Sequence, residues 1–333
     1  MNWRGSKNNL IKADFKLFRL KPCIDTKSLS LKRTNCALWR INFAYRQELY
    51  NVHSTEGAVR VLDSDVQASV QTFKIYELQS QSKDAFDIVL SSGFLAFSSH
   101  AGFLQAVDDK ELCVNGIMGT SAGALTGSLY AAGYTPEQVL EILCDKIPLS
   151  WLQGPSLRSG ALGALNLGPV IERLGELLPA TFEELPHDFA CAVVTSDGFG
   201  HGSYRLIDSG PLAEAVAASA AIPFLFQPVR LPQAEGALCA DGGKYDRVGL
   251  RAWRSRKRQK REDVIPVLAH VIARSSPFSG DDDVDALQQD EKDIIIIESP
   301  KSGMSLFSLG EYEAQAAITR ERVSNSLIKL AKH

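Results

Sequence analysis

A serine between two glycines stands where an apolar run gives way to a helical pattern. The motif G-x-S-x-G consists of Gly119, Thr120, Ser121, Ala122 and Gly123. A sharp turn between a strand and a helix exposes the Oγ of such a serine, and it needs small neighbours because it has no room for side chains. The N-terminus of the following helix directs its dipole and N–H groups to the place where an oxyanion would form. We therefore predict that Ser121 is a nucleophile in acyl transfer.

A second motif combines an acidic residue with two glycines at the end of an apolar segment. Asp241, Gly242 and Gly243 form D-G-G, which in isolation is typical of a tight turn. Here it follows the stretch A-A-S-A-A-I-P-F-L-F-Q-P at residues 217–228, which begins as a helix and stops at Ala-Ile-Pro. This combination indicates that D-G-G belongs to a functional site and is more than a tight turn.

Three stretches, in order and spacing, resemble the patatin-like phospholipase family, in its plant or cyanobacterial type. They are G-T-S-A-G, then S-G-P-L-A-E-A-V-A-A-S-A-A-I-P-F-L-F-Q-P, then D-G-G, and the resemblance is close over residues 87–249. It implies a three-layer α/β/α fold with a mainly parallel central sheet. It also implies a Ser-Asp dyad without a catalytic histidine, in which Ser121 matches the nucleophile and Asp241 the base. The implied activity is hydrolysis of fatty acyl esters in membrane lipids or glycerolipids, through an acyl-enzyme and without a metal or organic cofactor.

One loop departs from the family's pattern. Members carry G-G-G-x-R-G after the first strand, whereas residues 92–100 here are S-G-F-L-A-F-S-S-H, so that only Gly93 remains and Ala96 replaces the arginine. We expect the N–H groups of Gly93 and Phe94 to form the oxyanion hole, because every residue except proline has this donor. A bulky residue must nevertheless adopt a backbone shape that glycine takes freely. Two alternatives therefore stay open, a catalytically silent lipid-binding or scaffold protein and a transacylase.

Two histidines, His100 and His270, are further candidates for catalysis. Ser121, Asp241 and His270 follow the chain order of an α/β-hydrolase triad. His270 lies within an apolar run, however, where a hydrogen-bonded core imidazole is the ordinary explanation. We expect His100 to hold the loop after the first strand in place rather than to catalyse.

Short β-type runs alternate with helical patterns from residue 86 onward, which indicates a mainly parallel sheet flanked by helices. The predicted strands are residues 86–90, 114–118, 189–195, 264–272 and 294–298. Capping-box patterns at Thr135, Thr181 and Ser308 predict helix starts. We predict one acyl hydrolase domain over residues 84–333. The six cysteines show no spacing typical of a zinc site.

A basic run at residues 251–261 suggests a second property. Its cations recur at helical spacing, so a helix there would present them to anionic lipid. A solvated helix face and a nuclear-type signal are the alternatives, and no DNA-binding motif accompanies the run. The cations are Arg251, Arg254, Arg256, Lys257, Arg258, Lys260 and Arg261.

The N-terminal region has a different charge balance from the rest. Residues 1–50 carry 11 Lys and Arg against three acidic residues, although the whole chain has a net charge of −3. A basic segment that is poor in acidic residues and lacks an apolar core resembles an organelle transit peptide. We predict a leader over residues 1–60, with plastid favoured over mitochondrion and a soluble or peripheral membrane protein; a frayed tail on a cytoplasmic protein is the alternative. No apolar run approaches the ~20 residues of a membrane-spanning helix.

Overall fold

The computed structural model describes residues 85–154, 163–196, 202–263, 265–274 and 293–330. Within them, eight strands form one sheet in the order β5-β6-β3-β2-β1-β7-β8, and β4 also pairs with β3. The strands are β1 (Ala85–Leu90), β2 (Cys113–Gly119), β3 (Asp188–Ser196), β4 (Gly202–Ile207), β5 (Val229–Leu231), β6 (Ala237–Asp241), β7 (Val267–Ile272) and β8 (Ile294–Ser299).

The sheet is mainly parallel, as the sequence predicts. The pairs β3–β2, β2–β1, β1–β7 and β7–β8 are parallel. The pairs β3–β4, β3–β6 and β5–β6 are antiparallel. Because β1, β2 and β3 run in the same direction, their carboxyl ends meet at one edge, where α/β proteins place their ligands.

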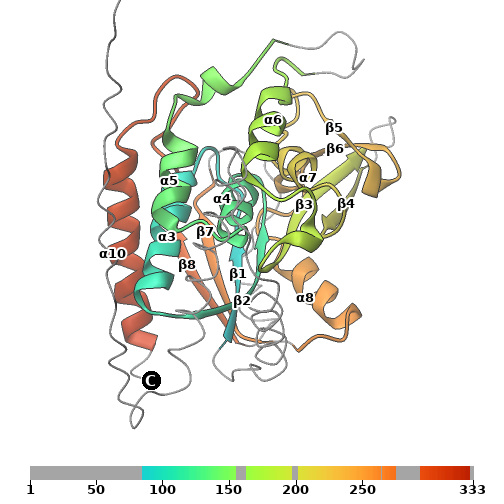
Figure 1. Ribbon diagram of the computed structural model, residues 1–333. Coiled ribbons are helices and arrows are strands. Elements are labelled where there is room, and N and C mark those ends of the chain that lie inside the picture. The colour runs from blue at the N-terminus through green and yellow to red at the C-terminus, as the bar shows by residue number, and fades with distance from the viewer. Residues whose placement is uncertain (1–84, 155–162, 197–201, 264, 275–292, 331–333) are drawn as a thin grey trace, which may run out of the picture.

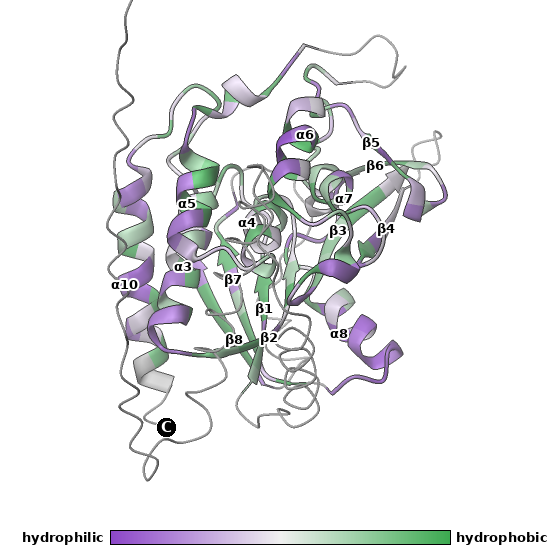
Figure 2. Cartoon of the chain, in the orientation of Figure 1, coloured by the Kyte–Doolittle hydropathy of each residue, from purple (hydrophilic) through white to green (hydrophobic). Residues whose placement is uncertain are grey.

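Helices cover both faces of this sheet (Figure 1). The α-helices are α3 (Phe97–Asp109), α4 (Ala122–Ala131), α5 (Pro136–Cys144), α6 (Gly168–Leu177), α7 (Leu212–Ser219), α8 (Leu250–Gln259) and α10 (Tyr312–Leu330). Short 3-10 helices are η1 (Pro148–Trp151), η3 (Phe182–Glu184), η4 (Pro232–Ala234) and η5 (Gly242–Lys244). The central strands are green and α8 is purple in the hydropathy colouring (Figure 2).

Alternate side chains of the central strands enter two apolar cores. Ile88 and Leu90 face the larger core, which they share with α3, α4 and α7. Val89 and Met118 face a smaller core on the opposite side, which Trp253 of α8 closes. This alternation is the two-residue period of a strand buried on both faces, and it produces the predicted three-layer α/β/α fold.

The five predicted strands are confirmed, with changes at their ends, and three strands were missed. β7 begins only at Val267 because Pro266 cannot donate to the ladder, and residue 264 lies outside the described residues. The missed strands β5 and β6 are short, with three and five residues, and none of the three missed strands has the continuous apolar character of a buried parallel strand.

The predicted helix starts have three different outcomes. The capping box at Thr135 is confirmed, since the Thr135 and Gln138 side chains each bond the other's backbone N–H. The α-helix expected at Thr181 is wrong: only η3 forms, and the carboxylate of Glu184, three residues after Thr181, accepts from the Ala180 N–H instead. The final helix exists but begins at Tyr312, four residues after Ser308.

One predicted feature, the N-terminal leader over residues 1–60, lies outside the described residues. Among the helices that the structure describes, none is both long enough and apolar enough to span a bilayer.

Candidate active site

Ser121 occupies the strained turn that its motif predicts. It lies between the last residue of β2 and the first residue of α4, with φ 56° and ψ −118°. A residue other than glycine takes a positive φ only at a cost, and such strain is typical of functional sites. The turn has no room for side chains, because a Cβ on Gly119 or Gly123 would overlap backbone atoms. The N–H of Thr120 donates to the Leu90 carbonyl at 3.0 Å and joins the turn to β1.

Asp241 lies beside this serine at the end of β6. Its buried carboxylate lies close enough to the Ser121 side chain for the serine to lower its pKa, and it accepts a hydrogen bond from the Gly243 N–H at 2.7 Å. Gly242 and Gly243 begin η5. Burial raises the pKa of Asp241 from 3.8 to about 6, although the Ser121 side chain and the Gly243 N–H both act to lower it. At neutral pH the carboxylate is therefore ionised and is a stronger base than an ordinary aspartate.

The last turn of α7 connects the serine to the aspartate. The Ser121 N–H donates to Ser219 Oγ at 3.1 Å, and the Asp241 N–H donates to the Ala221 carbonyl at 3.0 Å. The A-A-S-A-A-I-P stretch therefore positions both motifs. This stretch is one of the motifs that carry the family resemblance, but only the structure shows that Ser219 accepts from the Ser121 N–H.

Three backbone N–H groups are candidates for the oxyanion hole. Gly93 and Phe94 follow β1, and Ala122 is the first residue of α4. Within the described chain, none of the three donates to a backbone carbonyl. The motif places Ala122 in the turn after Ser121, and in the structure its N–H is also one of the free donors at a helix N-terminus.

The loop after β1 is strained one residue later than the sequence suggested. Leu95, not Phe94, has the positive φ, at 52°. Gly93 is needed for a different reason, because a Cβ there would lie 2.8 Å from the Ile272 side chain. The bulky Phe94 therefore does not require a backbone shape reserved for glycine.

Arg247, which the sequence did not predict as a functional residue, holds this loop in place through hydrogen bonds. Its guanidinium is buried and donates to the Ser92 carbonyl at 3.1 Å and to the Ile272 carbonyl at 2.6 Å. The Ser92 N–H returns a hydrogen bond to the Arg247 carbonyl at 2.7 Å. The only signal in the sequence is the position of this arginine just after D-G-G.

His100 and His270 form a buried hydrogen-bonded pair that does not include Ser121. The two Nδ1 atoms lie 2.9 Å apart, His100 Nε2 contacts the Ser91 carbonyl at 3.0 Å, and His270 Nε2 contacts Ser299 Oγ at 2.9 Å. Since a carbonyl only accepts, His100 donates from Nε2, and His270 must then donate to His100. Burial lowers the pKa of both imidazoles, that of His100 to about 4, so both are neutral.

These contacts argue against the triad alternative. Both ring nitrogens of His270 are engaged, and none faces the Ser121–Asp241 pair. His100 holds Ser91 immediately before the oxyanion loop, which is the structural role expected of it.

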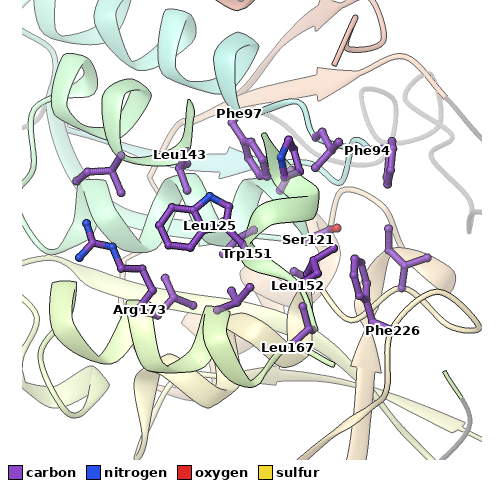
Figure 3. A pocket seen from close by; sticks show the side chains of 18 of the residues that line it. Phe94, Phe97, Ser121, Leu125, Leu143, Trp151, Leu152, Leu167, Arg173 and Phe226 are labelled. Carbon is purple, nitrogen blue, oxygen red and sulfur yellow. The ribbon is translucent and has the colours of Figure 1, made fainter. Parts of the chain in front are cut away.

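Ser121 lies at one end of an apolar pocket between α4, α5 and α6. The cavity volume of the pocket is about 130 Å³. Figure 3 shows Ser121 with Phe94 and Phe226 at one end and Arg173 at the other. The lining between them consists of leucines, Ile142, Val170 and Trp151, with Arg173 as its one charged side chain among the described residues. Such a lining suits an acyl chain.

The basic helix α8 does not form the continuous lipid-facing surface predicted from the sequence. Arg254, Arg256 and Lys257 are buried. The Arg256 guanidinium binds Asp188 at 2.6 and 2.8 Å and Asp208 at 2.7 Å. Of the seven cations, Arg251, Arg258, Lys260 and Arg261 are exposed, and the Lys260 ammonium lies 2.6 Å from an Asp208 oxygen.

The helix also lies at the wrong edge of the sheet for substrate delivery. Its partner Asp188 is the first residue of β3, whereas Ser121 follows the last residue of the parallel strand β2. Its buried cations are therefore near the amino ends of the strands. Binding of anionic lipid by α8 stays a proposal for its four exposed cations alone.

Within the described residues, no group of three or more His, Cys, Asp and Glu side chains could hold a metal ion.

One family model and several curated proteins are similar to part of this chain. Residues 88–252 match the family model described as patatin-like phospholipase. An uncharacterized NTE family protein of Mycobacterium tuberculosis is 32% identical over 162 residues, which are 48% of this chain and 42% of that protein. The uncharacterized protein YqhO of Bacillus subtilis is 27% identical over 223 residues, which are 56% of this chain and 71% of that protein. The chain thus spans less than half the length of the mycobacterial relative.

Among solved structures, VipD from Legionella pneumophila is similar at 17% sequence identity with a TM-score of 0.44. The match covers 74% of this chain and 67% of that chain. The plant or cyanobacterial type stays a prediction.

Proposed function

Residues 88–252 belong to the patatin-like phospholipase family, and from this premise we propose that the protein hydrolyses fatty acyl esters of lipids through Ser121 and Asp241. One observation carries the proposal. A serine in a strained turn, at one end of an apolar pocket, lies beside a buried aspartate of raised pKa. The proposed nucleophile, the proposed base and a pocket suited to an acyl chain are therefore close together.

In the first half of the reaction, Asp241 accepts the proton of the Ser121 hydroxyl while the serine oxygen attacks the ester carbonyl. The carbonyl oxygen becomes an oxyanion, which the N–H groups of Gly93, Phe94 and Ala122 stabilise together with the N-terminus of α4. The tetrahedral intermediate collapses when its bond to the alcohol breaks. Asp241 returns its proton to the departing alcohol, and the acyl group remains on Ser121.

In the second half, water takes the place of the alcohol. Asp241 accepts a proton from the water as its oxygen attacks the acyl carbon, and the bond to Ser121 breaks to release the fatty acid. Asp241 then protonates the Ser121 oxygen, which restores the starting state.

A fluorophosphonate probe tests the activated serine directly. Intact mass spectrometry should detect one adduct, peptide mapping should place it on Ser121, and Ser121→Ala should abolish it. Ser121→Ala and Asp241→Asn should each abolish hydrolysis of a lipid ester, and the double variant should lose no more than either single variant because the pair acts as a unit. Absence of an adduct on the folded protein would favour the catalytically silent lipid-binding or scaffold alternative.

His270→Ala is the control for the triad. This variant should lose stability, because it leaves His100 without its partner and opens a cavity. Its folded fraction should keep most of the activity. A loss as large as that of Ser121→Ala in a folded protein would replace the dyad with a triad.

A further inference from the structure

Four chain segments form a continuous strip at the pocket. They are residues 147–153, 163–167, 222–227 and 304–308. Backbone hydrogen bonds join them, from Leu149 N–H to the Leu306 carbonyl (2.9 Å), from Asn166 to Gln153 (2.8 Å) and from Leu165 to Leu225 (3.0 Å). We call these segments the rim strip.

Each segment of the rim strip also contributes to the pocket wall. Leu152, Leu167, Phe226 and Leu306 line the pocket, one from each segment. The strip is therefore continuous with the site that would receive an acyl chain.

Large apolar side chains project outward from the same strip. Phe224 is 86% exposed, Phe307 73% and Ile147 43%. In the part of the chain that the structure describes, only two other large apolar side chains are exposed, Tyr245 and Ile318. Phe224 also has a positive φ of 69°, so its outward position is kept in a conformation that a bulky residue rarely adopts. Exposed apolar groups concentrated at one site indicate a binding surface.

The rim strip is also uncharged. None of its four segments contains Asp, Glu, Lys or Arg, although these residues make up 23% of the chain. Two cations lie next to it, and each has an acidic neighbour: Lys146 is 3.9 Å from Asp145, and Arg173 is 2.8 Å from Glu176. Both cations also lie over the Trp151 ring. An apolar surface with an aromatic and cations at its border matches the boundary between lipid head groups and acyl chains.

We propose that the rim strip is the surface by which the protein docks on a lipid bilayer, with Phe224, Phe307 and Ile147 inserted among the acyl chains. This inference rests on the proposed function, because a lipid ester must pass from the bilayer into the pocket. Docking at the strip brings the pocket against the membrane and shortens the path of the acyl chain through water. The attraction comes from burial of apolar surface, so it needs no anionic lipid and responds weakly to salt.

Sedimentation with neutral phosphatidylcholine vesicles tests the proposal, using the full chain. Wild type should bind at both low and high salt. The double variant Phe224→Asn and Phe307→Ser should lower the partition coefficient by roughly tenfold or more for each side chain. Asn tolerates a positive φ, so the fold should be kept at residue 224. Ile318→Ser, which removes a 58% exposed side chain from α10, is the matched control and should bind as wild type does.

Two readouts separate docking from catalysis. Ser121→Ala should sediment as wild type does, because docking needs no turnover, and the Phe double variant should hydrolyse a short soluble ester at the wild-type rate. Equal vesicle binding by the double variant would overturn the proposal, as would an equal loss in Ile318→Ser. A dimer that the double substitution dissociates would assign the strip to contact between two copies and would also overturn it. Vesicle binding without esterase activity would leave docking in place and refute the proposed function.

Discussion

Burial of Asp241 has two opposite consequences. It makes the carboxylate a stronger base, and it lowers the stability of the folded protein when the carboxylate is ionised. Its pKa of about 6 in the folded protein predicts that kcat/KM for a short soluble ester rises tenfold per pH unit up to about pH 6 and is flat above it. The reason is that only the ionised carboxylate accepts the Ser121 proton. A rate–pH series in constant ionic strength measures this profile.

The same profile should persist in the folded fraction of His270→Ala. A midpoint near pH 7 that disappears in this variant would identify an imidazole base instead of the carboxylate.

Stability should change with pH in the opposite sense. The folded pKa of Asp241 lies above its unfolded value of 3.8, so the folded state binds the proton more tightly. Proton binding by Asp241 therefore stabilises the folded state. This stabilisation is fully present below about pH 4 and is lost as the pH rises through 6. Asp241→Asn should therefore raise the free energy of unfolding at pH 7.5 by on the order of 3 kcal/mol, because about two pKa units are involved.

Urea unfolding of both proteins at pH 4.5 and 7.5 measures the difference. The advantage of Asp241→Asn should shrink at the lower pH. An equal advantage at both values would show that the carboxylate's charge is not its source.

At the scale of elements, the loop after β1 depends on close packing against β7. Gly93→Ala places a Cβ 2.8 Å from Ile272, so the loop must shift and its N–H groups move away from the oxyanion. We expect kcat to fall by about 10- to 100-fold, since loss of one such donor costs at least this much. KM should change little because the acyl pocket is unaltered.

Gly175→Ala is the matched control for this substitution. No atom lies within 4 Å of the added Cβ in α6, and the variant should be as active as wild type and slightly more stable. Equal activity of Gly93→Ala would remove this loop from the catalytic machinery.

The helix α8 is attached through its buried cations. Arg256→Gln leaves Asp188 and Asp208 without their shared guanidinium. It should lower the free energy of unfolding by about 2 to 4 kcal/mol, somewhat less than for a fully buried pair because both carboxylates are partly exposed. Denaturant unfolding checks this value.

Arg258→Gln, on the exposed face of the same helix, should change stability by no more than about 0.5 kcal/mol. Similar losses in both variants would mean that the pairs of Arg256 contribute little. The contrast also matters for membrane tests, since glutamine at Arg256 or Lys257 would disturb the fold rather than report on lipid binding.

For the whole molecule, the described fold begins with the central strand β1 at Ala85. We expect residues 84–333 to unfold cooperatively and to keep esterase activity when produced alone. Residues 1–60 fused to a fluorescent reporter should enter plastids or mitochondria, which we propose as the location of the protein. Loss of the folded state in the fragment, measured by circular dichroism, would contradict the domain boundary, and a diffuse cytosolic reporter would contradict the leader.

The order of the motifs was enough to predict the fold class, which is confirmed, and to single out Ser121 and Asp241 as the pair proposed for catalysis. Ser121 was predictable because a strand-to-helix turn imposes local demands, namely small residues next to the serine. The central strands were predictable because burial on both faces requires continuous apolar runs, as in β1 and β7. Asp241 was assigned through its order relative to Ser121, not through its own surroundings.

The tertiary structure alone decided which partners the side chains meet. Ser219 and Arg247 support the site through contacts with residues 98 and 155 positions away, and no local pattern encodes such distances. The cations of α8 looked like one exposed face because helical spacing says nothing of the acidic residues packed against it. The rim strip likewise joins segments up to 157 residues apart, through the hydrogen bond from Leu149 to Leu306. Its uncharged character was present in the sequence, but only folding brings the four segments to the same pocket.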